Sequence, residues 1–327
     1  MNDSYTDDEL KLVARLYYVD GLGQADVASF VKASQAKVSR MLSLARERKI
    51  VRIVVDEYDP RHRELENKLC GKFGLLSAAV IKIPRGASAE DARRATGHFG
   101  AAFAHELIPH GSTVAIAGGR TMRELVHMLP QERKKNLLVV QAMGNIDSTV
   151  GPVDALELGR LMAHRWEGRF MTIPTPAYVP DKNIRDSFLA LDQLKEVWRK
   201  FKDVNVALVG IGTLANSIFA DHKVFSAADV KALERSGAVG EIFGRFYDAH
   251  GRECLSPWSE RVMSMSLERL QQVPQVIGVV AGADRSATLA AAIRGGLVKS
   301  LIIDETGAAA LLETAKPGSR SAPSAAV

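Results

Sequence analysis

The sequence has 327 residues, of which 46% are hydrophobic and 25% charged, and a formal net charge of +5. These proportions exclude disorder as the main state, and the length is enough for about two domains. No apolar run approaches the roughly 18 residues of a membrane helix, and residues 1–9 are acidic, unlike a secretory signal. We therefore expect a cytoplasmic protein with no membrane partner. The two cysteines, Cys70 and Cys254, indicate neither a disulfide framework nor a zinc site, and no cofactor is expected.

Three short helices are predicted at the N-terminus. Apolar residues recur at helical spacing over residues 10–17, and the pattern stops at residues 20–21, where Asp and Gly favour a turn. A second helix is predicted over residues 24–31. After a short turn, Ser34 can cap a third helix that has one apolar and one basic face. Two helices joined in this way are the layout of a helix-turn-helix unit.

Positive charge is concentrated in this region. Residues 32–52 include seven basic residues and one acidic residue, and several of the basic ones lie on the third helix. We therefore predict that this helix enters the major groove of double-stranded DNA. The predicted DNA contacts are Gln35, Lys37, Ser39 and Arg40. On charge alone, a solvated helix face would explain the cluster equally well.

A domain boundary is predicted near residues 56–60. The apolar run over residues 50–55 predicts a short strand. After the boundary, the pattern changes to apolar strand-like runs that alternate with helix-like segments. We expect an all-α domain over residues 1–56 and an α/β domain over residues 57–315. Residues 316–327 have the small-residue and proline composition of a disordered tail.

The second region alternates strands and helices. The predicted strands cover residues 79–83, 113–117, 137–141, 205–210, 275–280 and 300–303. The predicted helices cover residues 90–107, 156–166, 185–201, 227–236, 286–294 and 306–313. Short strands rich in Val, Ile and Leu that alternate with helices are typical of a doubly wound, mainly parallel sheet covered on both faces.

Three glycine-bearing loops follow predicted strands and precede helices, at residues 117–121, 210–213 and 281–286. Loops at the carboxyl ends of parallel strands line the ligand crevice of such sheets, and the helix starts that follow favour an anion such as phosphate. Arg120 and Thr121 add a guanidinium and a hydroxyl that can bind phosphate oxygens. Glycine at these turns is equally explained by backbone geometry.

No nucleotide-binding or nucleophile-elbow signature accompanies these loops. The polar residues that could face the crevice are Gln141, Asp147, Asp154, Glu241 and Asp284. Such residues could bind sugar hydroxyls or act as catalytic bases. The residue types alone therefore leave binding and catalysis both open.

Four segments carry a family resemblance. Residues 16–46 (LYYVDGLGQADVASFVKASQAKVSRMLSLAR) resemble the helix-turn-helix of the SorC family of bacterial sugar-responsive transcriptional regulators. Residues 117–122 (AGGRTM) are similar to the family's G-W-G-R-T-L loop, and residues 239–248 (VGEIFGRFYD) to its G-D-[IV]-x-G-x-F-x-D segment. Residues 279–312 are similar to its closing stretch. The resemblance spans nearly the whole chain.

The resemblance implies a DNA-binding head joined to an effector domain like sugar-phosphate isomerases and deaminases, assembled as a homodimer or homotetramer. It places Gly119, Arg120 and Thr121 on the family's phosphate-binding loop and Glu241 where the pattern has Asp. This sequence departs from the pattern at three positions. These are Gly118, where the pattern has Trp, Ala283, where it has Gly, and Ser286, where it has a Lys expected to meet the effector's phosphate.

The expected function is a transcriptional regulator whose operator binding is controlled by a sugar phosphate, sugar or polyol, with no catalysis. The expected effector-binding residues are Gly119, Arg120, Thr121, Gln141, Gly212, Glu241, Asp284, Arg285 and Ser286. The alternative is a sugar-phosphate isomerase or deaminase with a basic N-terminal appendage. That alternative leaves the capped basic helix without a purpose.

Overall fold

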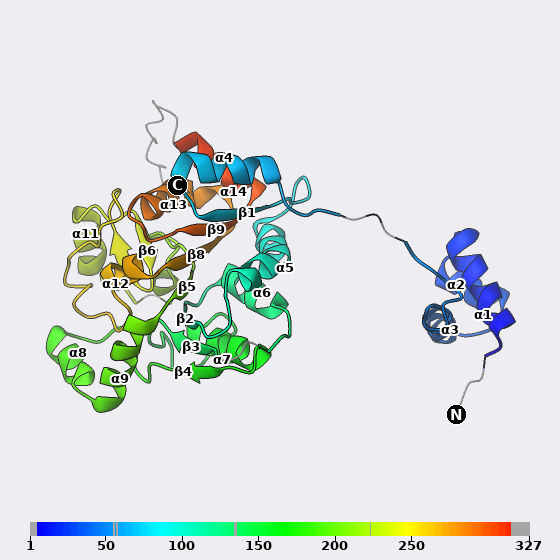
Figure 1. The fold of residues 1–327 in the computed structure, drawn as a ribbon, viewed down its shortest axis with the longest axis horizontal. Coiled ribbons are helices and arrows are strands. Elements are labelled where there is room, and N and C mark those ends of the chain that lie inside the picture. The colour runs from blue at the N-terminus through cyan, green and yellow to red at the C-terminus, as the bar shows by residue number, and fades with distance from the viewer. Residues whose placement is uncertain (1–4, 55, 57, 134–135, 223, 315–327) are drawn as a thin grey trace. The chain divides into compact units, whose positions relative to one another are not determined.

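The computed structural model describes residues 5–314, except residues 55, 57, 134–135 and 223 (Figure 1). The chain divides into two compact units, residues 1–58 and 59–327. Each unit has a hydrophobic core of its own. The predicted tail over residues 316–327 lies outside the described residues.

The first unit consists of the three predicted helices. They are α1 (Asp7–Ala14), which continues into a π-helical turn (Arg15–Val19), α2 (Gln24–Phe30) and α3 (Gln35–Glu47). Thr6 begins α1 with a reciprocal capping box, and the Ser34 hydroxyl accepts a hydrogen bond from the Lys37 amide at 3.2 Å to begin α3. The core of the unit is mainly apolar and draws on every helix; its members include Tyr5, Leu10, Leu16, Val27, Val38, Met41 and Leu42.

The strand predicted over residues 50–55 is wrong for residues 50–54, which form no strand, and residue 55 lies outside the described part. Ile53 and Val54 are 57% and 89% exposed. An apolar run becomes a strand only when another strand satisfies its backbone groups. The described residues of this unit contain no such strand.

The second unit is built on a seven-stranded sheet in the order β1-β9-β8-β5-β2-β3-β4, in which all neighbouring pairs are parallel (Figure 1). The strands are β1 (Ser77–Ile81), β2 (Thr113–Ile116), β3 (Leu138–Gln141), β4 (Arg169–Met171), β5 (Val206–Val209), β8 (Gln275–Val280) and β9 (Ser300–Asp304). All six predicted strands are confirmed, with ends shifted by up to two residues. The short edge strand β4 was not predicted.

Helices cover both faces of this sheet, which confirms the α/β prediction. Side chains of successive strand residues enter opposite cores: Val114 and Ile116 of β2 belong to one cluster, and Ala115 belongs to the other. The first cluster includes residues of α5 (Ala89–Glu106), α6 (Arg120–Met128) and α7 (Ala155–Arg165). The second includes residues of α4 (Arg63–Phe73), α9 (Asp192–Lys200), α11 (Ala227–Arg235), α12 (Leu267–Gln272), α13 (Ser286–Arg294) and α14 (Glu305–Thr314).

The helix predicted over residues 185–201 is two helices, α8 (Lys182–Leu189) and α9, followed by a 3-10 turn (Phe201–Asp203). The break falls at Leu191, whose φ of −71° and ψ of 136° are extended. The helices α4 and α12 had no prediction, and three smaller elements had none either. They are the antiparallel pair β6 (Gly240–Ile242) and β7 (Arg245–Tyr247), and the short helix α10 (Ile218–Asp221).

The connections leave the middle of the sheet in opposite directions. From β2 the chain passes through α6 to β3 on one side, and from β8 it passes through α13 to β9 on the other. Because α6 and α13 also pack on opposite faces of the sheet, their N-termini diverge around β5. Such a switch point opens a crevice at the carboxyl ends of the strands.

Candidate functional site

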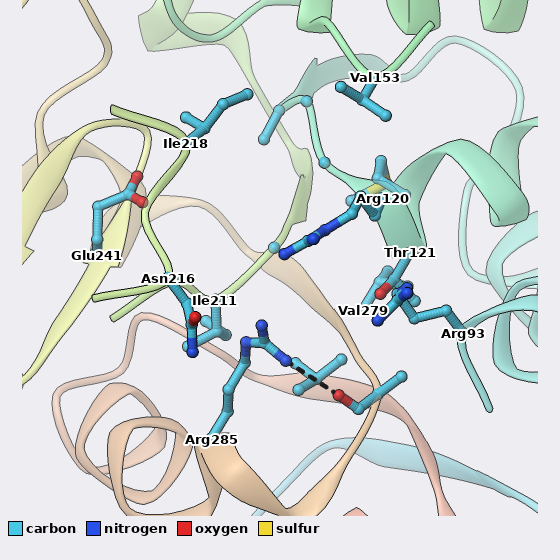
Figure 2. Close-up of a pocket in the computed structure, with 18 of the residues that line it drawn as sticks. Arg93, Arg120, Thr121, Val153, Ile211, Asn216, Ile218, Glu241, Val279 and Arg285 are labelled. Atoms are coloured by element: carbon cyan, nitrogen blue, oxygen red, sulfur yellow. Dashed lines mark hydrogen bonds between the residues drawn. The ribbon is translucent and has the colours of Figure 1, made fainter. Parts of the chain in front are cut away.

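A cavity of about 320 Å³ lies at this switch point (Figure 2). Its walls come from the loops after β2, β5 and β8, which are the three glycine-bearing loops of the sequence, together with residues of α5, α10 and β6. Apolar side chains that include Ile211, Ile218 and Val279 form part of the lining. A small ligand in this cavity would therefore meet apolar walls and a few polar groups, as is usual for small-molecule sites.

The loop after β2 turns sharply into α6. Gly119 has a φ of +133°, which strongly favours glycine, and its amide donates to the Val153 carbonyl at 2.8 Å. No side chain caps α6, so the amides of its first turn are available to a ligand. Helix starts of this kind bind anions through free N–H groups and the helix dipole.

The backbone around Val153 explains why this chain has Gly118 where the family pattern has Trp. A Cβ atom built on Gly118 would lie 2.5 Å from the Val153 carbonyl oxygen and 3.0 Å from the Ala155 amide nitrogen. Contacts this short exclude any side chain unless the backbone moves. The segment around Val153 therefore occupies the space beside the loop, and Val153 itself lines the cavity.

Three arginine side chains reach the cavity from three different elements, Arg93 from α5, Arg120 from α6 and Arg285 from the loop after β8 (Figure 2). Arg285 is 17% exposed, and its Nη1 donates to the Ala281 carbonyl at 3.2 Å and to Asp284 Oδ1 at 3.3 Å. Within the described part of the chain, Arg93 and Arg120 have no hydrogen-bond or ion-pair partner. Their guanidinium groups are available to a ligand.

Glu241 lies on another wall of the cavity, where β6 meets the loop after β5. The backbone of Glu241 exchanges two hydrogen bonds with Gly212, at 3.0 and 2.9 Å. Its side chain is 8% exposed, and Oε1 accepts the Gly244 amide at 2.6 Å. A Cβ atom on Gly212 would lie 2.5 Å from Glu241 Oε2, so the glycine leaves room for this carboxyl group.

Burial raises the pKa of Glu241, and hydrogen bonds from the Gly244 amide and the Ser217 hydroxyl offset this only in part. Between the ordinary pKa of a glutamate and this raised pKa, the folded chain binds more protons than the unfolded chain. The free energy of unfolding therefore falls as pH rises through that window. Above the raised pKa the full cost of the buried charge is present.

We expect Glu241→Gln to remove this pH dependence. The amide keeps a carbonyl acceptor for Gly244 but carries no charge, so its advantage over the parent should grow with pH, by at most about 1.4 kcal/mol per pH unit. Urea unfolding at a series of pH values measures this difference. Glu234→Gln, at an exposed carboxylate, is the matched control. A constant difference at every pH would contradict the assignment.

The structure brings together six of the nine expected effector-binding residues: Gly119, Arg120, Thr121, Gly212, Glu241 and Arg285 all line the cavity. The other three, Gln141, Asp284 and Ser286, do not. Asp284 is exposed beside Arg285, and Ser286 is the first residue of α13.

Gln141 is the clearest correction. It is fully buried at the end of β3, where its Oε1 accepts the Thr172 hydroxyl at 2.6 Å and the Ile173 amide at 3.0 Å, and its Nε2 donates to Asn145 at 2.9 Å. These bonds use the amide to join β3 to the segment after β4. Both polar atoms of the Gln141 side chain therefore have partners within the protein, and the residue is not part of the cavity lining.

Three polar residues of the lining were missed: Arg93, Asn216 and His222. Arg93 lies in a helix that had been predicted from its apolar stripe alone. Asn216 and His222 lie between β5 and α11, where the sequence pattern predicted no element. Only the spacing of Arg93 four residues before Gly97 could have signalled its role, because glycine within a helix often marks a close approach to another element.

The candidate DNA-contacting surface is the face of α3 opposite the core. Gln35, Ser39 and Arg40 are exposed, and their side chains have no hydrogen-bond or ion-pair partner among the described residues. Lys37 is half-buried, with its Nζ 5.3 Å from the centre of the Tyr5 ring. On the opposite face of α3, Val38 is fully buried in the core of the unit and holds the helix in place. A basic, anchored helix with a free face can insert into the major groove.

Comparison with known proteins decides between the two classes of function. Residues 60–313 match a protein-family model described as "Putative sugar-binding domain". The deoxyribonucleoside regulator of Bacillus subtilis is 28% identical over 303 residues, which cover 91% of this chain and 95% of that protein. The sorbitol operon regulator of Klebsiella pneumoniae is 27% identical over 314 residues, which cover 94% and 99%. The crystal structure of that full-length regulator, SorC, matches with a TM-score of 0.75 and 27% identity, over 95% of this chain and 100% of the other.

The chain belongs to the SorC family of transcriptional regulators. Its relatives are regulators and not enzymes, so the regulatory interpretation is confirmed and the isomerase or deaminase alternative is not favoured. No group of three or more potential metal ligands occurs among the described residues of this SorC family member. None of its described helices is long and apolar enough to span a membrane.

Proposed function

We propose that this SorC family regulator binds operator DNA through α3 and is controlled by a sugar phosphate held in the cavity at the switch point. The observation that carries the effector assignment is the loop after β2. There the uncapped start of α6, the Thr121 hydroxyl and the unpaired Arg120 guanidinium meet at one wall of the cavity. These are the donors that bind phosphate oxygens in proteins.

The opposite wall suits a polyhydroxylated carbon chain. Figure 2 shows Asn216 and Glu241 on the side of the cavity away from Thr121, with Ile211 and Ile218 near them. Amide and carboxyl groups can bond sugar hydroxyls, and the apolar side chains can contact the carbon skeleton. The two relatives are named for deoxyribonucleosides and for a sorbitol operon, and both deoxyribonucleosides and sorbitol carry hydroxyl groups.

Regulation then follows from a shift in population. The effector binds one arrangement of a homodimer or homotetramer more tightly than another, and the two arrangements differ in their affinity for operator half-sites. This regulation acts in the cytoplasm, and no catalytic step is required. The phosphate and the hydroxyl groups of the effector supply the differential contacts.

A thermal-shift screen tests the effector class. Each phosphorylated sugar or polyol of four to six carbons is paired with its unphosphorylated form. We expect phosphorylated members to raise the melting temperature, since a ligand at 100 times its Kd stabilises the fold by about 2.7 kcal/mol. The same compounds should change the affinity for operator DNA. Stabilisation by unphosphorylated compounds alone would contradict the phosphate assignment.

A further inference from the structure

Helices α5 and α6 pack unusually closely at Gly97. A Cβ atom on Gly97 would lie 2.4 Å from Glu124 Cβ and 2.6 Å from the Leu125 amide nitrogen, so only glycine allows this approach. Both helices follow strands of one parallel sheet and pack on the same face, so they run in the same direction. Residues one turn earlier on each helix are therefore neighbours as well.

One turn before Gly97 is Arg93, and one turn before Glu124 and Leu125 are Arg120 and Thr121. The packing of the two helices thus directs Arg93 toward the start of α6. Figure 2 shows the Arg93 guanidinium beside Thr121, at the edge of the cavity that both residues line. The close approach at Gly97 explains why a residue of α5 reaches a ligand cavity built mainly from loops.

Arg93 and its neighbour Arg94 have different surroundings. Arg94 is exposed and forms ion pairs with Glu90 at 3.0 Å and with Asp91 at 3.6 Å. Arg93 is half-buried and has no such partner in the described part of the chain. A partly buried cation without a partner costs free energy, because it loses contact with water. An anionic ligand beside Arg93 would offset this cost by pairing with the guanidinium.

The charges around the cavity are unbalanced. Three guanidinium groups line it, and Glu241 is the one carboxyl group among the lining residues. Burial raises the pKa of that carboxyl, which reduces the negative charge available to balance them. The lining therefore favours a ligand with more than one negative charge.

We propose that Arg93 is a specificity-determining residue that, together with Arg120 and Thr121, forms a subsite for a phosphate dianion. This inference rests on the proposed function and extends it to a residue outside the family's phosphate-binding loop. The family pattern presents a lysine at the position of Ser286, and Ser286 does not line the cavity. Arg93 supplies the missing positive charge from α5 instead.

Inorganic phosphate is the probe for this subsite, because it does not depend on which sugar the effector carries. Binding to the full-length chain is followed by ³¹P NMR and by melting temperature, at constant ionic strength with chloride in exchange. We expect Arg93→Ala to weaken phosphate binding at least about ten-fold, as for the loss of a charge-assisted hydrogen bond. Arg94→Ala, which removes the same charge from the same helix turn, should leave it unchanged.

The pH dependence of phosphate binding is a second measurement, and it should not change if Arg93 has only a structural role. Phosphate passes from monoanion to dianion near neutral pH, so the parent should bind it more tightly at pH 8 than at pH 5.5. In Arg93→Ala this preference should shrink. Equal binding by Arg93→Ala and the parent, or equal losses in Arg93→Ala and Arg94→Ala, would overturn the inference. The proposed function fails separately, if no sugar phosphate changes operator binding.

Discussion

Replacing Lys37 and Arg40 together by alanine is expected to weaken specific operator binding by at least about ten-fold in a gel-shift assay at physiological salt. Arg40 is exposed on the free face of α3, so a contact with a base edge would be worth about 1 to 3 kcal/mol. Lys37 is partly buried against Tyr5, where it suits a phosphate contact. Its loss should reduce the slope of log affinity against log salt by about one.

The DNA for this assay is a fragment that the parent protein selects from genomic DNA. Lys11→Ala is the control, because it removes a positive charge from an exposed position on α1, where Lys11 pairs with Asp8 at 3.1 Å. Circular dichroism confirms that the three helices persist in each variant. Unchanged affinity of the double variant with the fold intact would show that α3 does not carry the DNA contacts.

Arg120→Ala should lower the affinity for the effector sugar phosphate by roughly ten- to a hundred-fold, as expected for a charge-assisted hydrogen bond of about 1.5 to 3 kcal/mol. The affinity for the unphosphorylated form of the same compound should change little. Calorimetric titration of both compounds separates the contribution of the phosphate from that of the sugar. The effector concentration that half-maximally changes the affinity for operator DNA should rise in proportion.

Arg123→Ala is the matched control for this change. Arg123 lies three residues further along α6 and pairs with Glu124 at 3.3 Å, outside the cavity lining. Its replacement removes the same charge from the same helix without a ligand contact. If Arg120→Ala binds the sugar phosphate as tightly as Arg123→Ala does, the effector's phosphate lies elsewhere.

The fold was predictable where burial was complete. Strands such as β5 and β8 are covered on both faces, so nearly all of their residues are apolar and the sequence pattern predicts the strand. The edge strand β4 has three residues, one of them an exposed arginine, and leaves no such pattern. No glycine or proline marks the break at Leu191, because a leucine adopts an extended backbone conformation at little cost in free energy. No local signal could have marked it.

The sequence predicts a residue of the cavity lining where the position of that residue at the end of a strand is enough to place it. Arg120, Thr121 and Arg285 follow strands that end at the switch point, so the strand pattern alone placed them at the crevice. Gln141 also ends a strand, but the direction of its side chain depends on Thr172 and Ile173, which sequence spacing cannot bring together. Arg93 depends on how closely two helices pack, and that distance is a tertiary property.

The space beside Gly118 links the loop at residues 117–122 to the segment around Val153. The Trp of the resembled G-W-G-R-T-L pattern at position 118 would demand a different path for residues 153–155, because a Cβ atom on residue 118 would lie 2.5 Å from the Val153 carbonyl oxygen. A side chain at position 118 therefore requires a change in the path of residues 153–155 as well. A chimera that grafts another member's loop into residues 117–122 needs that member's partner segment too, and ligand preference should transfer as a two-part module rather than residue by residue.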